Sequence, residues 1–150
     1  MKNATYAVEL TCGYAEWWRY NIYLSVAEMD ADDRLTDYRS VVDRIYDIEE
    51  GSGGEVRKAP AGFEATPRTV SLETGVCDHI VIYLYVIANT FPASAKISNS
   101  PPFPMNFTVR HTPEGSPRET TEIFSHIYEV NQWGGVTVGG LRVPKEGDER

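Results

Sequence analysis

The stretch 79–89, HIVIYLYVIAN, constrains the fold of this chain more than any other segment. Nine of its residues are apolar or aromatic, most of these are β-branched or aromatic, and glycine, proline and charge are absent. That composition fits a β-strand that is packed on both faces or nearly so. We therefore expect the stretch to lie in the middle of a sheet and not at its edge.

Alternation of apolar and polar residues predicts further strands around it. Tyr6, Val8 and Leu10 alternate with smaller or polar residues, which is the period of a half-buried strand. A second strand is expected over 17–27, with its even-numbered residues from 18 to 26 on one face. The connection 13–16 is short and contains glycine, so we expect these two strands to pair as a hairpin.

The remainder of the chain repeats this pattern. Further strands are predicted near 69–72, 105–110, 122–130, 136–138 and 141–143, with turn residues every 8–12 positions. The chain is therefore predicted to be mainly β, an antiparallel β-sandwich or open barrel of about 7–8 strands.

One segment is predicted to be a helix. Over 34–48 the apolar residues recur at spacings of three and four, and aspartates precede them as possible N-caps, which is typical of an amphipathic helix. Two observations oppose this prediction. Acidic residues crowd the C-terminal end, where the helix dipole disfavours them, and β-branched and aromatic residues are weak helix formers.

Composition indicates one folded unit. The chain has 150 residues, of which 41% are hydrophobic and 24% charged, enough for one domain with a sizeable core. We expect a single domain over 1–150 with a flexible charged tail at 145–150. Cys12 and Cys77 are too few for a disulfide scaffold, and we expect two reduced, partly buried thiols.

The charge limits the classes of partner. Asp and Glu outnumber Lys and Arg by 22 to 14, which gives a net charge of −8. Such a charge disfavours nucleic acids and anionic membranes, so we expect no partner of either kind. The first residues lack the apolar core of a signal peptide, and we expect a cytoplasmic protein or one assembled into a virion or secretion machine.

Few residues indicate chemistry. The chain has no Gly-x-Ser-x-Gly, no phosphate-binding loop and no dinucleotide fingerprint, so we predict that it is not an enzyme. Asp30, Asp32 and Asp33 belong to the densest carboxylate cluster, and hard cations such as Ca²⁺ bind converging oxygens. We therefore expect no cofactor, with Ca²⁺ at these aspartates as the alternative. The segment does not match an EF-hand loop, because Arg34 and Leu35 occupy ligand and glycine positions.

Aromatic residues are the other candidates for function. They make up 11% of the chain, and aromatic side chains are enriched at binding hot spots. Cross-strand pairing on an outer sheet face is the alternative explanation. The interface candidates, all in or near predicted strands, are Trp17, Trp18, Tyr20, Tyr23, Tyr83, Tyr85 and Trp133.

The sequence therefore favours a non-catalytic protein–protein interaction protein. It would be a subunit or accessory component of a larger assembly such as a virion or secretion apparatus, or an acidic inhibitor or immunity-type binder. Its partner would be another protein, possibly basic, or a second copy. A calcium-dependent module using Asp30, Asp32 and Asp33, or a carbohydrate-binding module using the tryptophans, is the alternative. The least favoured hypothesis is an enzyme with a dispersed active site around His79, His111 or His126.

The two faces of the predicted strand 79–89 give the strongest indication of a binding surface. Ile80, Ile82 and Leu84 begin a continuous apolar face suited to a core. The opposite face, Val81, Tyr83, Tyr85 and Ile87, is too hydrophobic to face water comfortably in a two-layer sandwich. Either the helix at 34–48 covers it or another molecule does, and from the sequence we favour the helix.

Overall fold

The computed structural model describes residues 3–14, 17–43, 67–88, 103–130 and 135–145, and the structural statements below concern these residues. They form eight strands and one short 3-10 helix. In chain order the elements are β1 (Ala4–Cys12), η1 (Trp17–Arg19), β2 (Tyr20–Met29), β3 (Leu35–Asp43), β4 (Arg68–Glu73), β5 (His79–Ala88), β6 (Phe103–Pro113), β7 (Thr121–Val130) and β8 (Val136–Val143).

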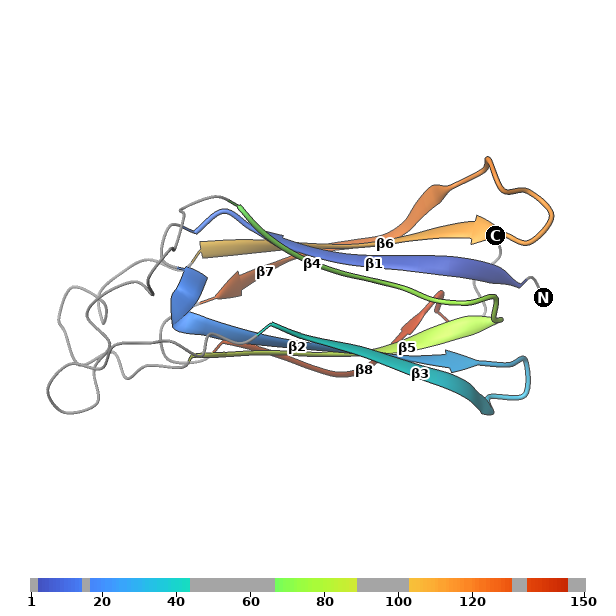
Figure 1. The fold of residues 1–150 in the computed structure, drawn as a ribbon, viewed down its shortest axis with the longest axis horizontal. Helices are drawn as coiled ribbons and strands as arrows, with labels where there is room; N and C mark the ends of the chain where they lie inside the picture. Colours follow the sequence, from blue (N-terminus) through green and yellow to red (C-terminus); the bar gives the residue numbers. More distant parts are fainter. Residues whose placement is uncertain (1–2, 15–16, 44–66, 89–102, 131–134, 146–150) are drawn as a thin grey trace, which may run out of the picture.

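The strands form two antiparallel four-stranded sheets packed face to face (Figure 1). The first sheet has the order β4-β1-β6-β7 and the second the order β3-β2-β5-β8. The predicted β-sandwich is thus confirmed, and the open barrel that the sequence left possible is not formed. β5 lies between β2 and β8, so the prediction that 79–89 occupies the interior of a sheet is also correct.

The predicted helix over 34–48 is wrong. Residues Leu35–Asp43 form β3, which pairs with β2 along its length, and positions 44–48 lie outside the described residues. The spacing that resembled a helix mixes both strand faces, because Val41 points inward while Tyr38 and Val42 point outward. Pairing with β2 stabilises residues that are weak helix formers, so tertiary context decides the outcome.

The predicted hairpin between β1 and the strand that follows it is also wrong. β1 and β2 lie in different sheets, and the hairpins among the described strands are β2–β3 and β6–β7. The intervening segment leads into η1, whose Trp18 is buried. The inward residues of β1 and β2 pack into one core from opposite sides, so the two strands lie in different layers.

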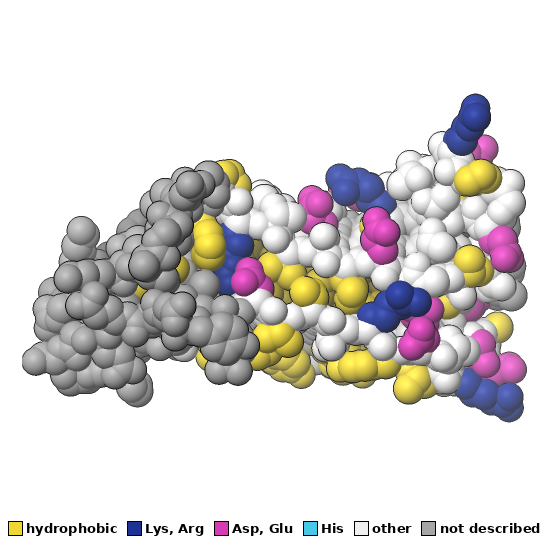
Figure 2. Space-filling view, in the orientation of Figure 1, with side chains coloured by type: hydrophobic (Ala, Val, Ile, Leu, Met, Phe, Trp, Pro, Cys, Tyr) yellow, Lys and Arg dark blue, Asp and Glu magenta, His cyan; other side chains and the backbone are white. Residues whose placement is uncertain are grey.

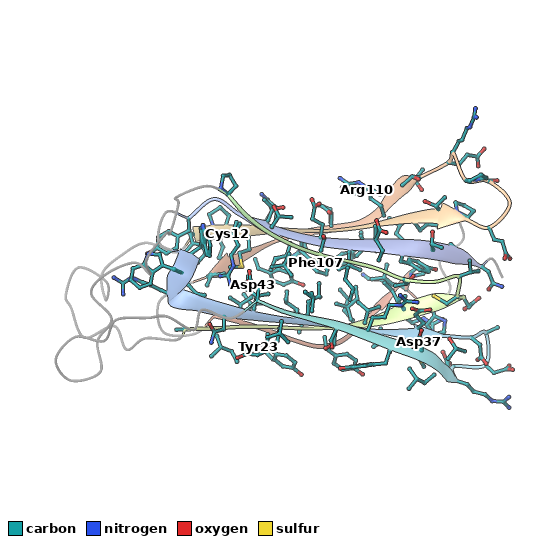
Figure 3. All side chains as sticks on the ribbon, viewed as in Figure 1. Cys12, Tyr23, Asp37, Asp43, Phe107 and Arg110 are labelled. Carbon is teal, nitrogen blue, oxygen red and sulfur yellow. The ribbon has the colours of Figure 1, made fainter. Side chains whose placement is uncertain are left out.

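The core lies between the two sheets. Alternate residues of the inner strands are fully buried there, such as Val8 and Leu10 of β1, Leu24 of β2 and Ile82 of β5. In Figure 3 the ring of Phe107 from β6 lies between the layers, and Figure 2 shows hydrophobic side chains along the seam between them. The core is the alternating inward set that the sequence predicted for β1, β2 and β5.

A buried arginine joins the two sheets at one end. Arg68 begins β4 in the first sheet and is only 4% exposed. Its guanidinium donates to the Asp43 carboxylate and carbonyl of β3 at 2.7 and 2.9 Å. It also donates to the carbonyl oxygens of Trp17 and Tyr20, both at 2.8 Å. One side chain therefore satisfies several polar groups that the closing sandwich takes out of water.

Backbone and phenol contacts join the sheets at the other end. The hydroxyl of Tyr6 in β1 donates to the carbonyl of Asp78, just before β5, at 2.7 Å. Ala4 and Cys77 exchange backbone hydrogen bonds of 2.9 Å, and the Tyr6 amide donates to the hydroxyl of Thr74 at 3.0 Å. These contacts hold the 74–78 connection against β1. The two sheets are therefore joined by separate sets of hydrogen bonds at the two ends of the sandwich.

Replacing Arg68 is expected to destabilise the protein strongly. Arg68→Ala leaves the carbonyls of Trp17 and Tyr20 without their donor, and hydrogen bonds to charged groups are worth about 1.5–3 kcal/mol each. We expect the free energy of unfolding, measured by urea denaturation, to fall by roughly 3–5 kcal/mol.

The matched control is Arg110→Ala, because Arg110 lies on the outer face of the first sheet. That change is expected to stay within about 0.5 kcal/mol of wild type. Equal effects of the two substitutions would contradict the role assigned to Arg68.

Both cysteines are free and buried, as the sequence predicted. Cys12 ends β1, whereas Cys77 pairs with Ala4 at its start, so about 26 Å of strand separates them. Burial raises the pKa of the Cys77 thiol from 9.0 to about 11 and raises that of Cys12 as well. Neither thiol is therefore a reactive nucleophile near neutral pH.

The raised pKa of the Cys77 thiol predicts that the protein becomes less stable at alkaline pH. The unfolded chain releases the Cys77 proton near pH 9, whereas the folded chain holds it until about pH 11. The stability that this thiol contributes is therefore complete below pH 9 and is lost as the pH rises through that window. We expect the free energy of unfolding to decline from pH 9 to 11 and to decline less steeply in Cys77→Ala. Equal slopes for the two proteins would exclude Cys77 as the source.

Candidate binding surface

The outer face of the second sheet carries a concentration of tyrosine. Strands β2, β3 and β5 each direct alternate residues away from the core, and those residues come together on one surface. We call this surface the tyrosine face. It comprises Tyr23, Ser25, Ala27 and Met29 of β2, Leu35, Tyr38, Ser40 and Val42 of β3, and Val81, Tyr83, Tyr85 and Ile87 of β5.

Strand register sets the arrangement of the rings. Tyr23 lies opposite Tyr85 on β5, and Ser25 lies opposite Tyr83. Tyr38 on β3 lies opposite Ala27. Directly opposed residues have Cβ atoms about 4.5–5.5 Å apart, so on β2 Ser25 lies beside the ring of Tyr83 and Ala27 beside the ring of Tyr38. The face consequently has a low centre with aromatic walls.

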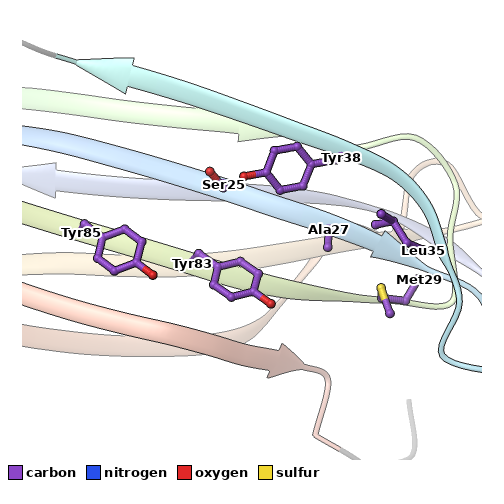
Figure 4. A pocket seen from close by; sticks show the side chains of 7 residues that line it. All are labelled: Ser25, Ala27, Met29, Leu35, Tyr38, Tyr83 and Tyr85. Carbon is purple, nitrogen blue, oxygen red and sulfur yellow. The ribbon is translucent and has the colours of Figure 1, made fainter.

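This arrangement creates a groove of about 460 Å³ along β2. Figure 4 shows Ser25 and Ala27 on its floor, with Tyr38 on one side and Tyr83 and Tyr85 on the other. Met29 and Leu35 close the end beside the turn that joins β2 to β3. The groove therefore has small side chains on its floor, a mostly apolar lining and phenol hydroxyls at its border.

Much of the apolar surface here is open to solvent. Leu35 is 61% exposed, Tyr38 55%, Val42 52% and Ile87 50%. In Figure 3 the side chain of Tyr23 also points away from the opposite sheet. Scattered exposed apolar residues are normal, but a contiguous patch marks a site of interaction.

The other outer face of the sandwich provides an internal comparison. The first sheet directs the charged residues Glu9, Glu73, Arg110, Glu122 and Glu129 outward, as a sheet face in water does. Figure 2 shows Lys, Arg, Asp and Glu scattered over that side and hydrophobic side chains gathered beneath the second sheet. No residue of the tyrosine face as defined above is charged, and beside it β8 directs Thr137, Gly139 and Arg142 to the same side of the sheet. Of the two outer faces, this one lacks the composition of a solvated surface.

The predicted interface residues separate into two groups. Tyr23, Tyr83 and Tyr85 lie together on the tyrosine face. Trp18 and Tyr20 are each 3% exposed and belong to the core.

The tryptophans do not form a sugar-binding platform within the described residues. Trp17 packs against the core, with the Arg68 guanidinium 4.7 Å from its ring centre, and Trp133 lies outside the described residues. Leu35, Tyr38 and Val42 were missed because their segment was expected to be helical, although the alternation of Tyr38, Ser40 and Val42 with Arg39, Val41 and Asp43 was a signal for a strand.

The acidic residues between β2 and β3 stabilise a turn. An Asp30 carboxylate oxygen accepts the amide N–H groups of Asp32 at 2.8 Å and Arg34 at 2.9 Å. The hydrogen bond from the Arg34 amide is the main reason that the pKa of Asp30 lies below its ordinary value. Asp33 adopts a positive φ of 58°, a conformation that Asp and Asn tolerate better than most residues.

Asp33 also joins a polar cluster at the end of the tyrosine face. The ring of His79, 1% exposed, contacts the Asp78 carboxylate through Nδ1 at 2.7 Å and the Asp33 carboxylate through Nε2 at 2.8 Å. Arg142 of β8 donates to the same Asp33 oxygen at 2.9 Å. Both ring nitrogens of His79 therefore face protein groups, so the cluster fastens the turn to β5 and β8.

Two of the three predicted metal ligands, Asp30 and Asp33, have partners within the protein. The Asp30 carboxylate caps the turn and the Asp33 carboxylate binds His79 and Arg142. Within the part of the chain that the structure describes, no group of three or more His, Cys, Asp or Glu side chains could hold a metal ion. Calcium binding remains a prediction from the sequence alone.

The cluster predicts that two neighbouring aspartates differ in their effect on stability. Asp33→Asn keeps a side chain that tolerates positive φ but removes the charge that pairs with Arg142 and His79. We expect the free energy of unfolding to fall by roughly 0.5–1 kcal/mol, since Asp33 is largely exposed and screened by water. Asp32→Asn, in the same turn, is the control and is expected to change nothing measurable by thermal denaturation. A loss of the same size in Asp32→Asn would refute the assignment.

Comparisons with models of protein families, with curated proteins and with solved structures find no match to this chain. No helix among the described residues is long and apolar enough to cross a membrane. The functional argument therefore depends on the geometry and composition of the surface alone.

Proposed function

We propose that this chain is a non-catalytic protein–protein interaction protein, a component of a larger assembly that binds its partner through the tyrosine face. The observation that carries the proposal is the contrast between the two outer faces of one sandwich. One face has the charged residues expected of a surface in water, and the other has rings and aliphatic side chains over β2, β3 and β5, with Arg142 of β8 as the charged residue beside them.

Burial of such a face on binding is favourable. Removing apolar surface from water contributes about 25 cal/mol per Å², and the exposed side chains of Leu35, Tyr38, Val42 and Ile87 supply that surface. Tyrosine also suits an interface because its large ring has few torsions to immobilise and its hydroxyl retains a hydrogen-bond partner at the rim. These properties support a protein partner over a small ligand held by charge.

The same composition argues against the acidic inhibitor expected as one variant from the sequence. An inhibitor of a basic target places its carboxylates where the target binds. The tyrosine face has none, and the nearby carboxylate of Asp33 is already paired with Arg142. The proposal is accordingly an assembly component with a largely uncharged contact.

The test is a double substitution on the face. Tyr83→Ser with Tyr85→Ser removes two rings and their apolar area. Cross-strand pairs are worth about 0.2–1 kcal/mol each, so the variant is expected to fold with a loss of roughly 1–2 kcal/mol. It is expected to lose association, measured by sedimentation of the purified protein and by retention of partners from a cell extract.

Ile127→Ser is the matched control. Ile127 is an apolar residue that is 56% exposed on the outer face of the first sheet, so this variant is expected to associate as wild type does. The proposal fails if wild type shows no self-association and retains no extract protein. It also fails if the double substitution leaves both kinds of association unchanged.

A further inference from the structure

We infer that the occupant of the tyrosine face is a second copy of this chain, packed sheet against sheet. The inference rests on the proposed function and specifies its partner. The charge and the shape of the face support it, and its size sets how strong the contact can be.

The charge argument starts from the net charge of −8. Two copies repel one another at every orientation that brings their carboxylates together, and like charges at an interface cost several kcal/mol. On the tyrosine face two copies can meet without burying a carboxylate, since its side chains are uncharged and the charged residue directed outward beside it is Arg142 of β8. A basic partner would instead gain from acidic residues at the contact, so the absence of carboxylates argues against a basic partner and is compatible with a second acidic copy.

The shape argument concerns self-complementarity. In a twofold dimer the same patch serves on both subunits, so it must contain both a projection and a recess. The tyrosine face contains both, because Tyr83 and Tyr85 stand on one side of a groove whose floor is Ser25 and Ala27. Rings of one copy therefore have apolar recesses to enter on the other, with their hydroxyls at the border.

The size argument sets the strength of the dimer. From Val81 to Ile87 the face runs about 20 Å along the strands, and its three strands span about 14 Å across. That footprint of roughly 300 Å² is well below the about 800 Å² per partner that stable interfaces bury. We therefore expect a weak, reversible dimer and not an obligate one.

Salt dependence separates a second copy from a basic partner. Between about 0.05 M and about 0.5 M NaCl the screening length shortens severalfold. Repulsion between two acidic copies is then screened, so sedimentation equilibrium is expected to show a dimer that tightens as salt is added. A contact with a basic protein weakens under the same change.

Ser25 provides a test specific for self-association, because it lies at the centre of the face between Ser40 and Tyr83. Ser25→Lys and Ser25→Glu each place like charges within the proposed dimer and are expected to weaken it at least about tenfold. Mixing the two variants in equal amounts is expected to restore association, since Lys then meets Glu. Ser71→Lys and Ser71→Glu, on the outer face of β4, are the controls and are expected to dimerise as wild type does.

The outcomes distinguish this inference from the proposed function. A dimer that is weakened by each Ser25 variant and restored in the mixture supports both. A wild-type protein that stays monomeric up to several hundred micromolar, or a dimer unaffected by charge at Ser25, overturns the inference. If wild type is monomeric but retains extract proteins that the Tyr83→Ser with Tyr85→Ser variant does not retain, the proposed function survives with another partner. If the double substitution changes neither self-association nor retention, both fail.

Discussion

A two-layer sandwich provides one buried face to each strand, and the remaining features of this protein follow from that constraint. The inward residues of β2 and β5 form the core with those of β1 and β6. Their outward residues meet water or another molecule. On the first sheet those positions carry charge, whereas on the second they carry rings and aliphatic groups. An apolar outer face is unfavourable for an isolated domain, which is why the second sheet is the natural place to look for function.

Polar side chains fix the relative position of the layers at both ends. Arg68 is buried at one end and donates to carbonyls of the second sheet, while the Tyr6 hydroxyl donates to the Asp78 carbonyl at the other. Glu28, also buried, pairs with Arg39 and accepts from the Gly75 amide. Apolar packing alone tolerates sliding of one sheet over the other, but buried hydrogen bonds have fixed partners. The outer face is thus presented on a scaffold held in one geometry.

Much of this was readable in the sequence, and the exceptions have physical causes. Alternation identified the core residues of β5 and the outward pair Tyr83 and Tyr85, because strand period depends on local sequence. The segment containing Tyr38 was misassigned to a helix, since pairing of β3 with β2 is a long-range interaction that overrides spacing. Trp18 and Tyr20 were interface candidates but are buried, because which aromatic residues the two sheets cover depends on long-range packing that local sequence does not show.

The connections between strands have a consequence for how the chain folds. Of the seven connections between the described strands, five pass from one sheet to the other, and two, β2–β3 and β6–β7, stay within a sheet. Each sheet therefore contains strands from both halves of the chain. Such non-local pairing requires the closure of long loops early and slows folding to the range of about milliseconds to seconds. During that interval unpaired strand edges are exposed, so a newly made chain is more prone to mispairing than a chain built of successive hairpins.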